Sequence, residues 1–490
     1  MKKTIALSLC LAAAAALANP KTLTLWRGET LYCPDCEIDA TSLPAGLSVR
    51  NGLAREVAYT LLDGKGRPAG RKTFHDRVEW GAGGEGRKVA EISAAADMKP
   101  GAYKAGETEI VVIDRVLPPP AKWNYYLDLW QHPWAVSRYC GVKPFSEEHF
   151  KAMEPLWRLL ADAGNKTLTV TITRLPWNHQ CYDGYDSMIG RVKRADGSWA
   201  FDYSVFDRYV EFGRACGLGP DISCYTMCPW SYMVYWQDAE GKVQKAKAVP
   251  GTAVFNDFWG DFLVDFAKHL KEKGWFNNTY IALDERSPKD VKEIVGFVNA
   301  KAPGLKVSLA GNKPPSQFEG IKIDNCTFAL GHLSDKLIGE AASRKKQGLI
   351  TSYYVCCSPA RPNTFCHSSL EESYWIGAYP AMSGLDGFLR WAWNSWPKDP
   401  DHDATFLENG RRWASGDTYL AYPGGKPSLR FLELRNGIVA AEKLSILKKS
   451  GAELSGFAAL AAKYNRKAAL AGKCDFKALR RETQELVNRP

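Results

Sequence analysis

Strand-like and helix-like patterns alternate along the chain after about residue 120. Eight short runs rich in apolar and β-branched residues are nearly all followed by an amphipathic stretch or a long connection. The candidate strands cover residues 125–130, 167–175, 221–227, 279–285, 305–311, 326–330, 349–356 and 386–396. Alternation of this kind predicts a parallel sheet, and eight units over about 270 residues predict a (β/α)8 TIM barrel. The alternative is a doubly wound sheet, but no glycine-rich phosphate loop follows an early strand.

The pattern differs on either side of this region, which predicts a multidomain chain. Residues 19–120 contain short strand-like runs separated by Gly, Pro and Asp, and this spacing predicts an antiparallel β-sandwich domain. The stretch "LPPPAK" then indicates a stiff boundary. We assign residues 121–425 to the barrel and residues 426–490 to a C-terminal helical region.

The first 18 residues have the pattern of a secretory signal peptide. Lys2 and Lys3 precede an apolar run that ends in Ala16-Leu17-Ala18, which resembles a cleavage site. The run is too short for a membrane span, so no transmembrane span is expected. We expect export to the periplasm, the cell surface or the medium after cleavage. A retained anchor, with lipid on Cys10, is the alternative.

The cysteine count and the net charge indicate which bonds and which binding partners to expect. Removal of Cys10 leaves 12 of the 13 cysteines, an even number that permits disulfides in an exported protein. Cys33 and Cys36 could form a redox pair, half of a zinc site or a tight local disulfide. The net charge is +10, but the basic residues are scattered among acids, so no nucleic-acid surface is expected. We expect no metal or cofactor, because metal-binding histidine spacing and a nucleotide loop are both missing from the sequence.

Two adjacent acids, Asp284 and Glu285, close the fourth candidate strand. Catalytic groups in barrels lie at the C-terminal ends of the strands, so this position favours a catalytic role. Two structural roles are the alternatives. The acids could form an ion pair with Arg286, or they could lie at a helix N-terminus ahead of Pro288.

Other strand ends carry a shared mixture of aromatic and amide or imidazole side chains. Aromatic faces stack on sugar rings, and the polar groups supply directional hydrogen bonds to hydroxyl groups. The mixture therefore predicts a carbohydrate ligand. The candidate substrate-binding residues are Trp130, His132, Asn178, Gln180, Tyr225, Tyr353, Tyr354, Trp391, Trp393 and Asn394.

The adjacency of the acids indicates how a sugar would be cleaved. Ordinary glycosidases keep their two carboxyl groups on opposite sides of the scissile bond, about 5–10 Å apart, which neighbouring residues serve poorly. A substrate-assisted route suits them better, because the sugar's own 2-acetamido oxygen is then the nucleophile. Asp284 would orient the acetamido group and stabilise the developing positive charge. Glu285 would be the acid/base, with its pKa raised by the neighbouring carboxylate.

The sequence resembles glycoside hydrolase family 123, the exo-β-N-acetylgalactosaminidases. The resemblance rests on "LDLWQHPWAVSRY", "PWNHQCYDGYDSMI", "LDE", "DGFLRWAWNSWP" and "GDTYLAYPGG…SLRFLELRNGI". It implies a β-sandwich, a (β/α)8 barrel and a retaining, substrate-assisted mechanism that releases terminal β-linked N-acetylgalactosamine (GalNAc). The family's Asp-Glu pair matches Asp284 and Glu285. A tyrosine that contacts the acetamido oxygen fits Tyr353 or Tyr354.

Three hypotheses about function remain open at this stage. The first is an exo-β-N-acetylgalactosaminidase that acts on glycans with terminal β-GalNAc. The second is a related retaining β-glycosidase for another sugar, such as N-acetylglucosamine (GlcNAc). The third is a surface carbohydrate-binding protein without catalysis, which would need the aromatic platform but not the acid pair.

Overall fold

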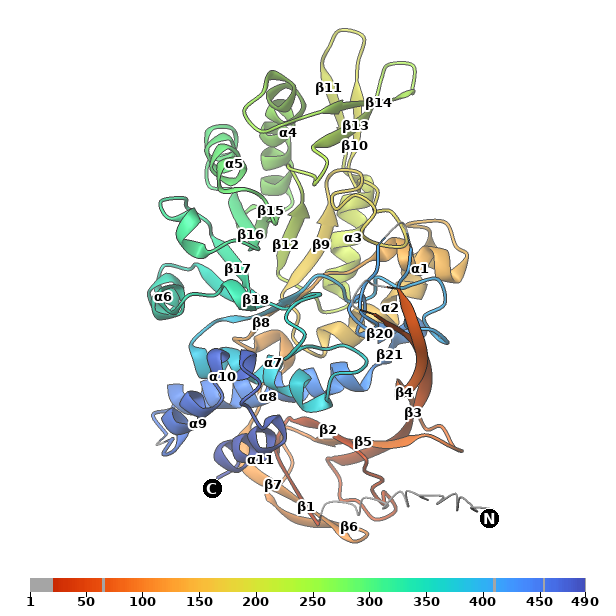
Figure 1. Cartoon of the computed structure of the whole chain (residues 1–490), viewed down its shortest axis with the longest axis vertical. Helices are drawn as coiled ribbons and strands as arrows, with labels where there is room; N and C mark the ends of the chain where they lie inside the picture. The colour runs from red at the N-terminus through yellow and green to blue at the C-terminus, as the bar shows by residue number, and fades with distance from the viewer. Residues whose placement is uncertain (1–20, 64–66, 409–410, 453, 490) are drawn as a thin grey trace, which may run out of the picture.

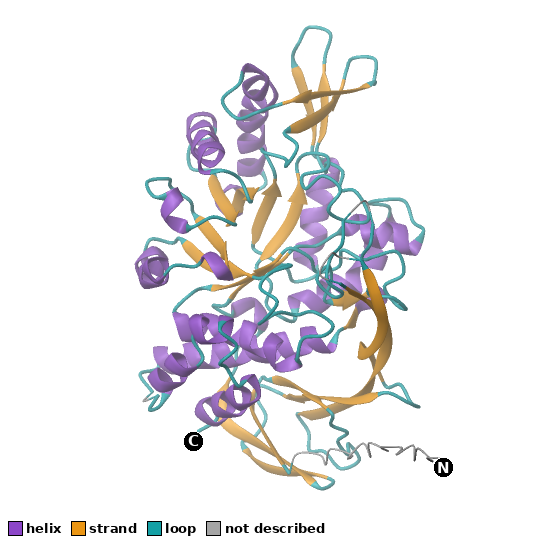
Figure 2. Cartoon of the chain, viewed as in Figure 1, coloured by secondary structure: helices purple, strands orange, loops and turns teal. Residues whose placement is uncertain are grey.

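A parallel barrel occupies the middle of the molecule, with helices around it and a strand-rich N-terminal region beside the C-terminal helices (Figure 1, Figure 2). The computed structural model describes residues 21–63, 67–408, 411–452 and 454–489. The expected signal peptide, residues 1–18, lies outside these described residues.

All eight predicted strands are present and form one parallel sheet in the order β8-β19-β18-β17-β16-β15-β12-β9. The first and last strands meet through a single bridge between Leu127 and Asn165 and a hydrogen bond from Lys166 N–H to the Leu127 carbonyl (2.8 Å). The sheet is therefore a nearly closed, TIM-like barrel. Its strands are β8 Tyr126–Leu129, β9 Thr167–Thr171, β12 Asp221–Tyr225, β15 Thr279–Asp284, β16 Lys306–Gly311, β17 Asn325–Ala329, β18 Ile350–Tyr354 and β19 Gly387–Arg390.

Helices follow most of the barrel strands and continue into the C-terminal region. They are α1 Pro133–Cys140, α2 Glu147–Ala161, α3 Ser204–Ala215, α4 Ala253–Glu272, α5 Pro288–Lys301, α6 Asp335–Lys346, α7 Leu370–Ser383, α8 Leu429–Lys449, α9 Phe457–Lys463, α10 Arg466–Leu470 and α11 Phe476–Val487. Helices α7 and α8 approach closely because each has a glycine at the contact. A Cβ atom on Gly377 would overlap the Leu434 carbonyl oxygen, so a larger side chain does not fit there.

A small four-stranded sheet interrupts the connections after β9 and β12. Its strands are β10 Gly190–Lys193, β11 Trp199–Asp202, β13 Met233–Gln237 and β14 Val243–Lys247, in the order β11-β10-β13-β14. The sheet stands beyond the ends toward which β9 and β12 point (Figure 1). It therefore lies at the C-terminal end of the barrel, where catalytic groups are expected.

The N-terminal region contains two sheets, in the orders β1-β7-β6 and β2-β5-β3-β4. Side chains from both sheets, among them Leu25, Ile110, Leu31 and Ile92, form one buried cluster. The pairs β2–β5, β3–β4, β3–β5 and β6–β7 are antiparallel as predicted, whereas β1 pairs with β7 in parallel, which corrects the prediction for this one pair. Parallel pairing is possible because the whole second sheet separates these two strands in the sequence. The strands are β1 Thr22–Arg27, β2 Thr30–Pro34, β3 Leu47–Leu62, β4 Pro68–Trp80, β5 Arg87–Ala94, β6 Gly101–Ala105 and β7 Thr108–Val116. The β-sandwich and the domain boundaries stay predictions.

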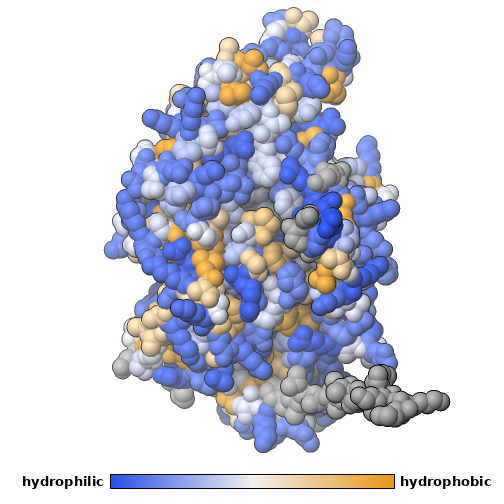
Figure 3. All heavy atoms as spheres, in the orientation of Figure 1, coloured by the Kyte–Doolittle hydropathy of each residue, from blue (hydrophilic) through white to orange (hydrophobic). Residues whose placement is uncertain are grey.

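Apolar side chains on the exterior are scattered rather than gathered. The face shown in Figure 3 is mostly hydrophilic, with separate apolar patches. Among the described residues, the helices are all too short or too polar to span a bilayer. Cys33 and Cys36 form a disulfide. Of the three roles considered for this pair, the structure therefore shows the tight local disulfide.

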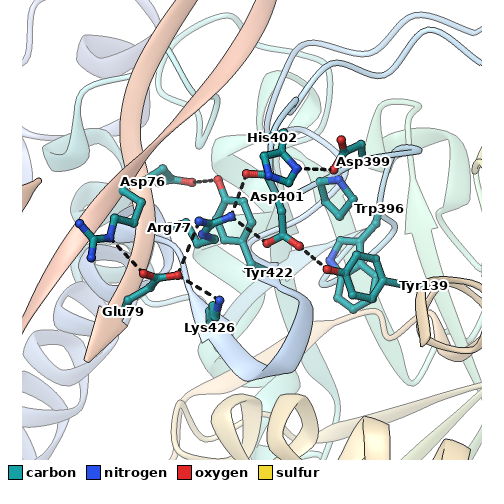
Figure 4. A network of polar contacts seen from close by, with 12 residues as sticks. Asp76, Arg77, Glu79, Tyr139, Trp396, Asp399, Asp401, His402, Tyr422 and Lys426 are labelled. Atoms are coloured by element: carbon teal, nitrogen blue, oxygen red, sulfur yellow. Dashed lines mark hydrogen bonds and ion pairs between the residues drawn. The ribbon is translucent and has the colours of Figure 1, made fainter. Parts of the chain in front are cut away.

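Charged groups join the strand-rich region to the rest of the chain. In Figure 4, residues of β4 contact the segment between β19 and α8: Tyr422 donates to Asp76 (2.8 Å), and Lys426 pairs with Glu79 (3.0 Å). Arg430 of α8 also pairs with Asp76, at 2.9 Å, and both side chains are almost fully buried. Because the pair is shielded from solvent, each buried charge is stabilised mainly by its partner.

We expect Asp76→Ala to destabilise the protein strongly. The substitution leaves Arg430 buried without its carboxylate, and breaking a buried pair in this way costs about 3–5 kcal/mol of unfolding free energy. Denaturant unfolding followed by tryptophan fluorescence measures the change. The matched control is Asp114→Ala, which removes an exposed partner of Arg27 and should leave the midpoint nearly unchanged. Equal midpoints for the two variants would contradict the role assigned to the buried pair.

Candidate active site

The two acids lie at the C-terminal end of β15, and the backbone turns between them. Asp284 ends the strand and is 8% exposed, whereas Glu285 is half-buried. Glu285 has a φ of 51°, in the left-handed region that non-glycine residues rarely adopt. Its N–H donates to the Ala310 carbonyl (2.8 Å), which anchors the turn to β16. The two side chains consequently do not obey the strict alternation of a strand.

Tyr354, the last residue of β18, shows that the two carboxyl groups converge. Its hydroxyl donates to Glu285 Oε1 at 2.8 Å. Its pKa is raised well above the ordinary value by burial first, and then by the negative charges of Glu285 and Asp284. One phenol therefore lies near both acids.

The two structural alternatives for the acids do not hold. Within the described part of the chain, Arg286 forms no salt bridge with either acid; its guanidinium donates to the Pro229 carbonyl (3.3 Å). The residue that caps α5 is Ser287, whose side chain accepts from the N–H of Asp290. Asp284 and Glu285 are thus not explained by an ion pair or by helix capping.

Asn312, just after β16, is a site residue that the sequence analysis missed. Its Nδ2 donates to Glu285 Oε2 at 2.9 Å, so both carboxylate oxygens of Glu285 are held. Its Oδ1 is buried and has no hydrogen-bond partner among the described residues. The position at a strand end was the available signal, but a single Asn without aromatic neighbours in the sequence did not stand out.

Asp284 occupies a more apolar position than Glu285. Burial raises the pKa of Asp284 well above its usual value, and the charge of Glu285 adds to the rise. Arg286 and the indole groups of Trp230 and Trp177 offset part of it. Of the two acids, Asp284 is the more deeply buried, and its carboxyl group is therefore the one that burial shifts toward the neutral form.

A cluster of aromatic rings surrounds this end of the barrel. Trp130 stacks on Trp177 with ring centroids 5.1 Å apart, and it lies 4.4 Å from Tyr225. Tyr354 and Trp391 belong to the same buried cluster. The structure therefore brings together Trp130, Tyr225, Tyr354 and Trp391 of the predicted substrate-binding residues.

Several polar atoms in this cluster lack partners. The indole N–H groups of Trp130, Trp177 and Trp230 are buried and form no hydrogen bond of ordinary length and angle, although those of Trp177 and Trp230 approach Asp284 and that of Trp130 approaches Asp128. Buried polar groups in folded proteins are nearly always hydrogen-bonded. The unpartnered Oδ1 of Asn312, whose Nδ2 holds Glu285, is therefore positioned for a polar ligand.

Trp391 is held by a buried ion pair that the sequence did not reveal. Arg390 and Asp417 are fully buried, with a closest approach of 2.7 Å. Asp417 also accepts from the Trp391 indole at 3.3 Å. Asp417 lies in a long connection without strand or helix periodicity, so no pattern marked it.

Two predicted residues point away from the acids. Tyr353 is fully buried, donates to the Ile376 carbonyl of α7 (2.7 Å) and packs on Tyr379. Because neighbours on a strand face opposite sides, Tyr354 and Tyr353 cannot both reach the site. Trp393 is likewise buried, against Phe431 of α8. The prediction that Tyr353 and Trp393 bind substrate is therefore corrected.

His132 and Asn394 join the ends of the first and last barrel strands, β8 and β19, through two buried hydrogen bonds. Asn394 Oδ1 accepts from the His132 N–H (2.8 Å), and Asn394 Nδ2 donates to the His132 carbonyl (3.0 Å). The His132 ring stacks on Tyr185, and burial lowers its pKa to about 3, so the imidazole is neutral. The amide of Asn394 is used by the protein backbone, so this residue supports the site instead of contacting substrate.

The last two predicted residues lie on the loop that carries Trp177. Asn178 and Gln180 are half-buried, and Asn178 has a φ of 54°. The Gln180 carbonyl accepts from the Trp413 indole (3.0 Å), which ties this loop to the segment after β19. Both side chains remain candidates for substrate contact.

A TIM-like barrel whose strand ends combine a pair of carboxyl groups with aromatic rings has the architecture of a glycoside hydrolase. The family model "Glycoside hydrolase 123, catalytic domain" matches residues 130–447 of the chain. The chain belongs to glycoside hydrolase family 123, as its motifs predict.

A solved structure shows the same fold. A family 123 glycoside hydrolase from Clostridium perfringens, from a study of glycolipid glycan hydrolysis, has a TM-score of 0.80 and 23% identity, covering 96% of this chain and 94% of that chain. A family 10 xylanase with a bacterial Ig-like domain, from termite gut, has a TM-score of 0.35 and 11% identity, covering 87% and 100%. This second likeness is too weak to bear on the fold. Comparison with curated proteins gives no match.

We expect Tyr354→Phe to lower kcat by up to about tenfold. The substitution removes one of the two hydrogen bonds that fix the Glu285 carboxylate, and one such bond contributes about 0.5–1.5 kcal/mol. The matched control is Tyr353→Phe, which should lower the unfolding temperature and leave kcat unchanged. Equal kcat values for the parent and the Tyr354 variant would contradict a functional hydrogen bond to Glu285.

Proposed function

We propose that the protein is a retaining exo-glycosidase that removes terminal β-linked GalNAc by substrate-assisted catalysis. The observation that carries the proposal is the pairing of two adjacent carboxyl groups in different surroundings. Asp284 is buried among indole groups, whereas Glu285 is half-buried and held through both oxygens by Tyr354 and Asn312. Neighbouring residues of this kind fit a division of labour at one face of the sugar.

In the first step, the oxygen of the sugar's 2-acetamido group attacks the anomeric carbon. Asp284 accepts the acetamido N–H and stabilises the positive charge of the oxazolinium ion that forms. Glu285 gives its proton to the departing glycosidic oxygen. Burial favours the neutral form of Asp284 in the empty site, and the developing positive charge favours its ionised form, so this interaction strengthens toward the transition state.

In the second step, Glu285 removes a proton from water as the water attacks the anomeric carbon. The bond between this carbon and the acetamido oxygen breaks, and the sugar leaves with its original β-configuration. The position of Glu285 suits both proton transfers, because it is half-exposed while Tyr354 and Asn312 fix its carboxylate. No metal or cofactor takes part in either step.

The proposed substrates are glycans with a terminal β-GalNAc, such as glycolipid headgroups. The Clostridium perfringens relative, described for glycolipid glycan hydrolysis, supports a glycan of this kind. We also propose that the chain is exported after cleavage of residues 1–18, which fits a substrate outside the cytoplasm.

Paired aryl glycosides test the sugar specificity. Release of nitrophenol from the β-GalNAc substrate should exceed release from the β-GlcNAc substrate at least tenfold. Hydrolysis of the GlcNAc substrate alone would keep the mechanism and overturn the specificity. Sugar binding without turnover of either substrate would favour a carbohydrate-binding protein.

A further inference from the structure

A cavity lies on the inserted sheet. Its volume is about 440 Å³, within the range of small-ligand sites. It is bounded by the loop after β9, by strands β10, β11 and β13 and by Val243 of β14. The residues that matter for its chemistry are Arg174, Asp186, Asp202, Tyr235 and Gln237.

The cavity adjoins the candidate active site through a shared loop. Residues 174–189 carry Trp177 and Tyr185 into the aromatic cluster and Arg174 and Asp186 into the cavity wall. The Trp230 N–H donates to the Pro176 carbonyl (3.0 Å), which joins this loop to the connection that contains β13. The inserted sheet also stands at the C-terminal end of the barrel (Figure 1). Both features place the cavity at the same end of the barrel as the acids.

The two faces of the inserted sheet differ in their contacts. One face packs on α4, where Trp199 and Trp236 lie against Phe258. Side chains alternate along a strand, so Tyr235 and Gln237 project on the face opposite Trp236, and both of them line the cavity. This second face is therefore available to a ligand.

The lining combines an aromatic ring with hydrogen-bonding groups of both kinds. Tyr235 is half-buried, and the Arg174 guanidinium lies over its ring at 5.5 Å. In the described part of the chain, Arg174 forms no ion pair or hydrogen bond, so its donors are available. Asp186 and Asp202 are exposed acceptors. Donors and acceptors around an aromatic face suit sugar hydroxyls, and the mixed charge favours a neutral sugar over an anionic one.

We propose that this cavity binds the neutral sugar units on the leaving-group side of the scissile bond. The proposal rests on the proposed function, since it extends the same substrate beyond its terminal GalNAc. Tyr235 is the stacking platform, and Arg174 donates to a hydroxyl group. The enzyme therefore recognises an oligosaccharide and not the terminal sugar alone.

The test compares a short and a long substrate. One is the aryl β-GalNAc, and the other is a neutral tetrasaccharide with β-GalNAc at its non-reducing end. Tyr235→Ala and Arg174→Ala should each raise KM for the tetrasaccharide about tenfold and leave kcat/KM for the aryl substrate within about twofold. The control is Tyr103→Ala, a half-buried tyrosine of the N-terminal region, which should change neither.

The outcomes separate the two proposals. Unchanged tetrasaccharide kinetics in both variants would overturn the leaving-group site and leave the proposed function intact. An equal loss on both substrates would also overturn it, because it would place Tyr235 and Arg174 in support of the acids. A parent protein that cleaves neither substrate would overturn the proposed function and this extension with it. Direct titration of the tetrasaccharide into Glu285→Gln protein gives a readout that does not depend on turnover.

Discussion

Glu285→Gln should reduce turnover of a GalNAc oligosaccharide by about 10³-fold or more, with sugar binding retained. Removal of a positioned general acid/base typically costs about 10²–10⁴-fold. The amide keeps the shape of the side chain and can still contact Tyr354 and Asn312, but it cannot transfer a proton. Steady-state kinetics measure the loss, and titration with the oligosaccharide measures binding.

The dependence on leaving group makes this prediction specific. A dinitrophenyl leaving group needs little protonation, so the first step of the variant should be impaired far less with it than with an oligosaccharide. The control is Glu293→Gln, an exposed glutamate on α5, which should behave like the parent. Parent-level oligosaccharide turnover by Glu285→Gln would contradict the acid/base role.

Asp284→Asn should lower kcat by about 10²–10³-fold, which is the usual effect of removing one preorganised group that stabilises transition-state charge. The neutral amide no longer stabilises the positively charged oxazolinium. It can also present its own N–H to the acetamido group in the wrong sense. Steady-state kinetics with the aryl β-GalNAc substrate measure the loss, and a loss below about tenfold would contradict the assigned role.

The same variant should be more stable than the parent at neutral and alkaline pH. The folded protein raises the pKa of Asp284 above its unfolded value, so the protonated form is the one that folding favours. The free energy of unfolding of the parent therefore falls as pH rises from the pKa of Asp284 in the unfolded chain toward its pKa in the folded protein. Asparagine does not ionise, so the Asp284→Asn variant does not lose this stability. Thermal unfolding at several pH values should show equal stability near pH 4 and a more stable variant above pH 7. A variant that is less stable at every pH would point to a structural role for Asp284.

The barrel could be predicted from the sequence because each of its strands is a short apolar run of regular spacing. The inserted sheet could not. Its strand Val243–Lys247 contains Gln244, Lys245 and Lys247, and its four strands have four or five residues each. Such segments resemble polar loops, and their pairing depends on α4 lying beneath them. The parallel pairing of β1 with β7 was hidden for a related reason, since partners far apart in sequence leave no local signal.

The site was predictable where it depends on strand ends and unpredictable where it depends on side-chain direction. The sequence placed Asp284, Glu285, Trp130 and Tyr225 at the correct end of the barrel. It could not choose between Tyr353 and Tyr354, because the choice depends on which face of β18 turns inward. The partners of His132 and Asn394 were likewise hidden, since they are each other's neighbours only after the barrel closes.

A series of aryl β-GalNAc substrates with zero to three fluorines on the N-acetyl group tests the central claim most directly. Fluorine withdraws electrons from the acetamido oxygen and makes it a poorer nucleophile, while the leaving group stays the same. If that oxygen attacks the anomeric carbon, kcat/KM should fall steeply with each fluorine, by several orders of magnitude over the series. A rate independent of fluorination would show that the acetamido group is not the nucleophile and would contradict the roles assigned to Asp284 and Glu285.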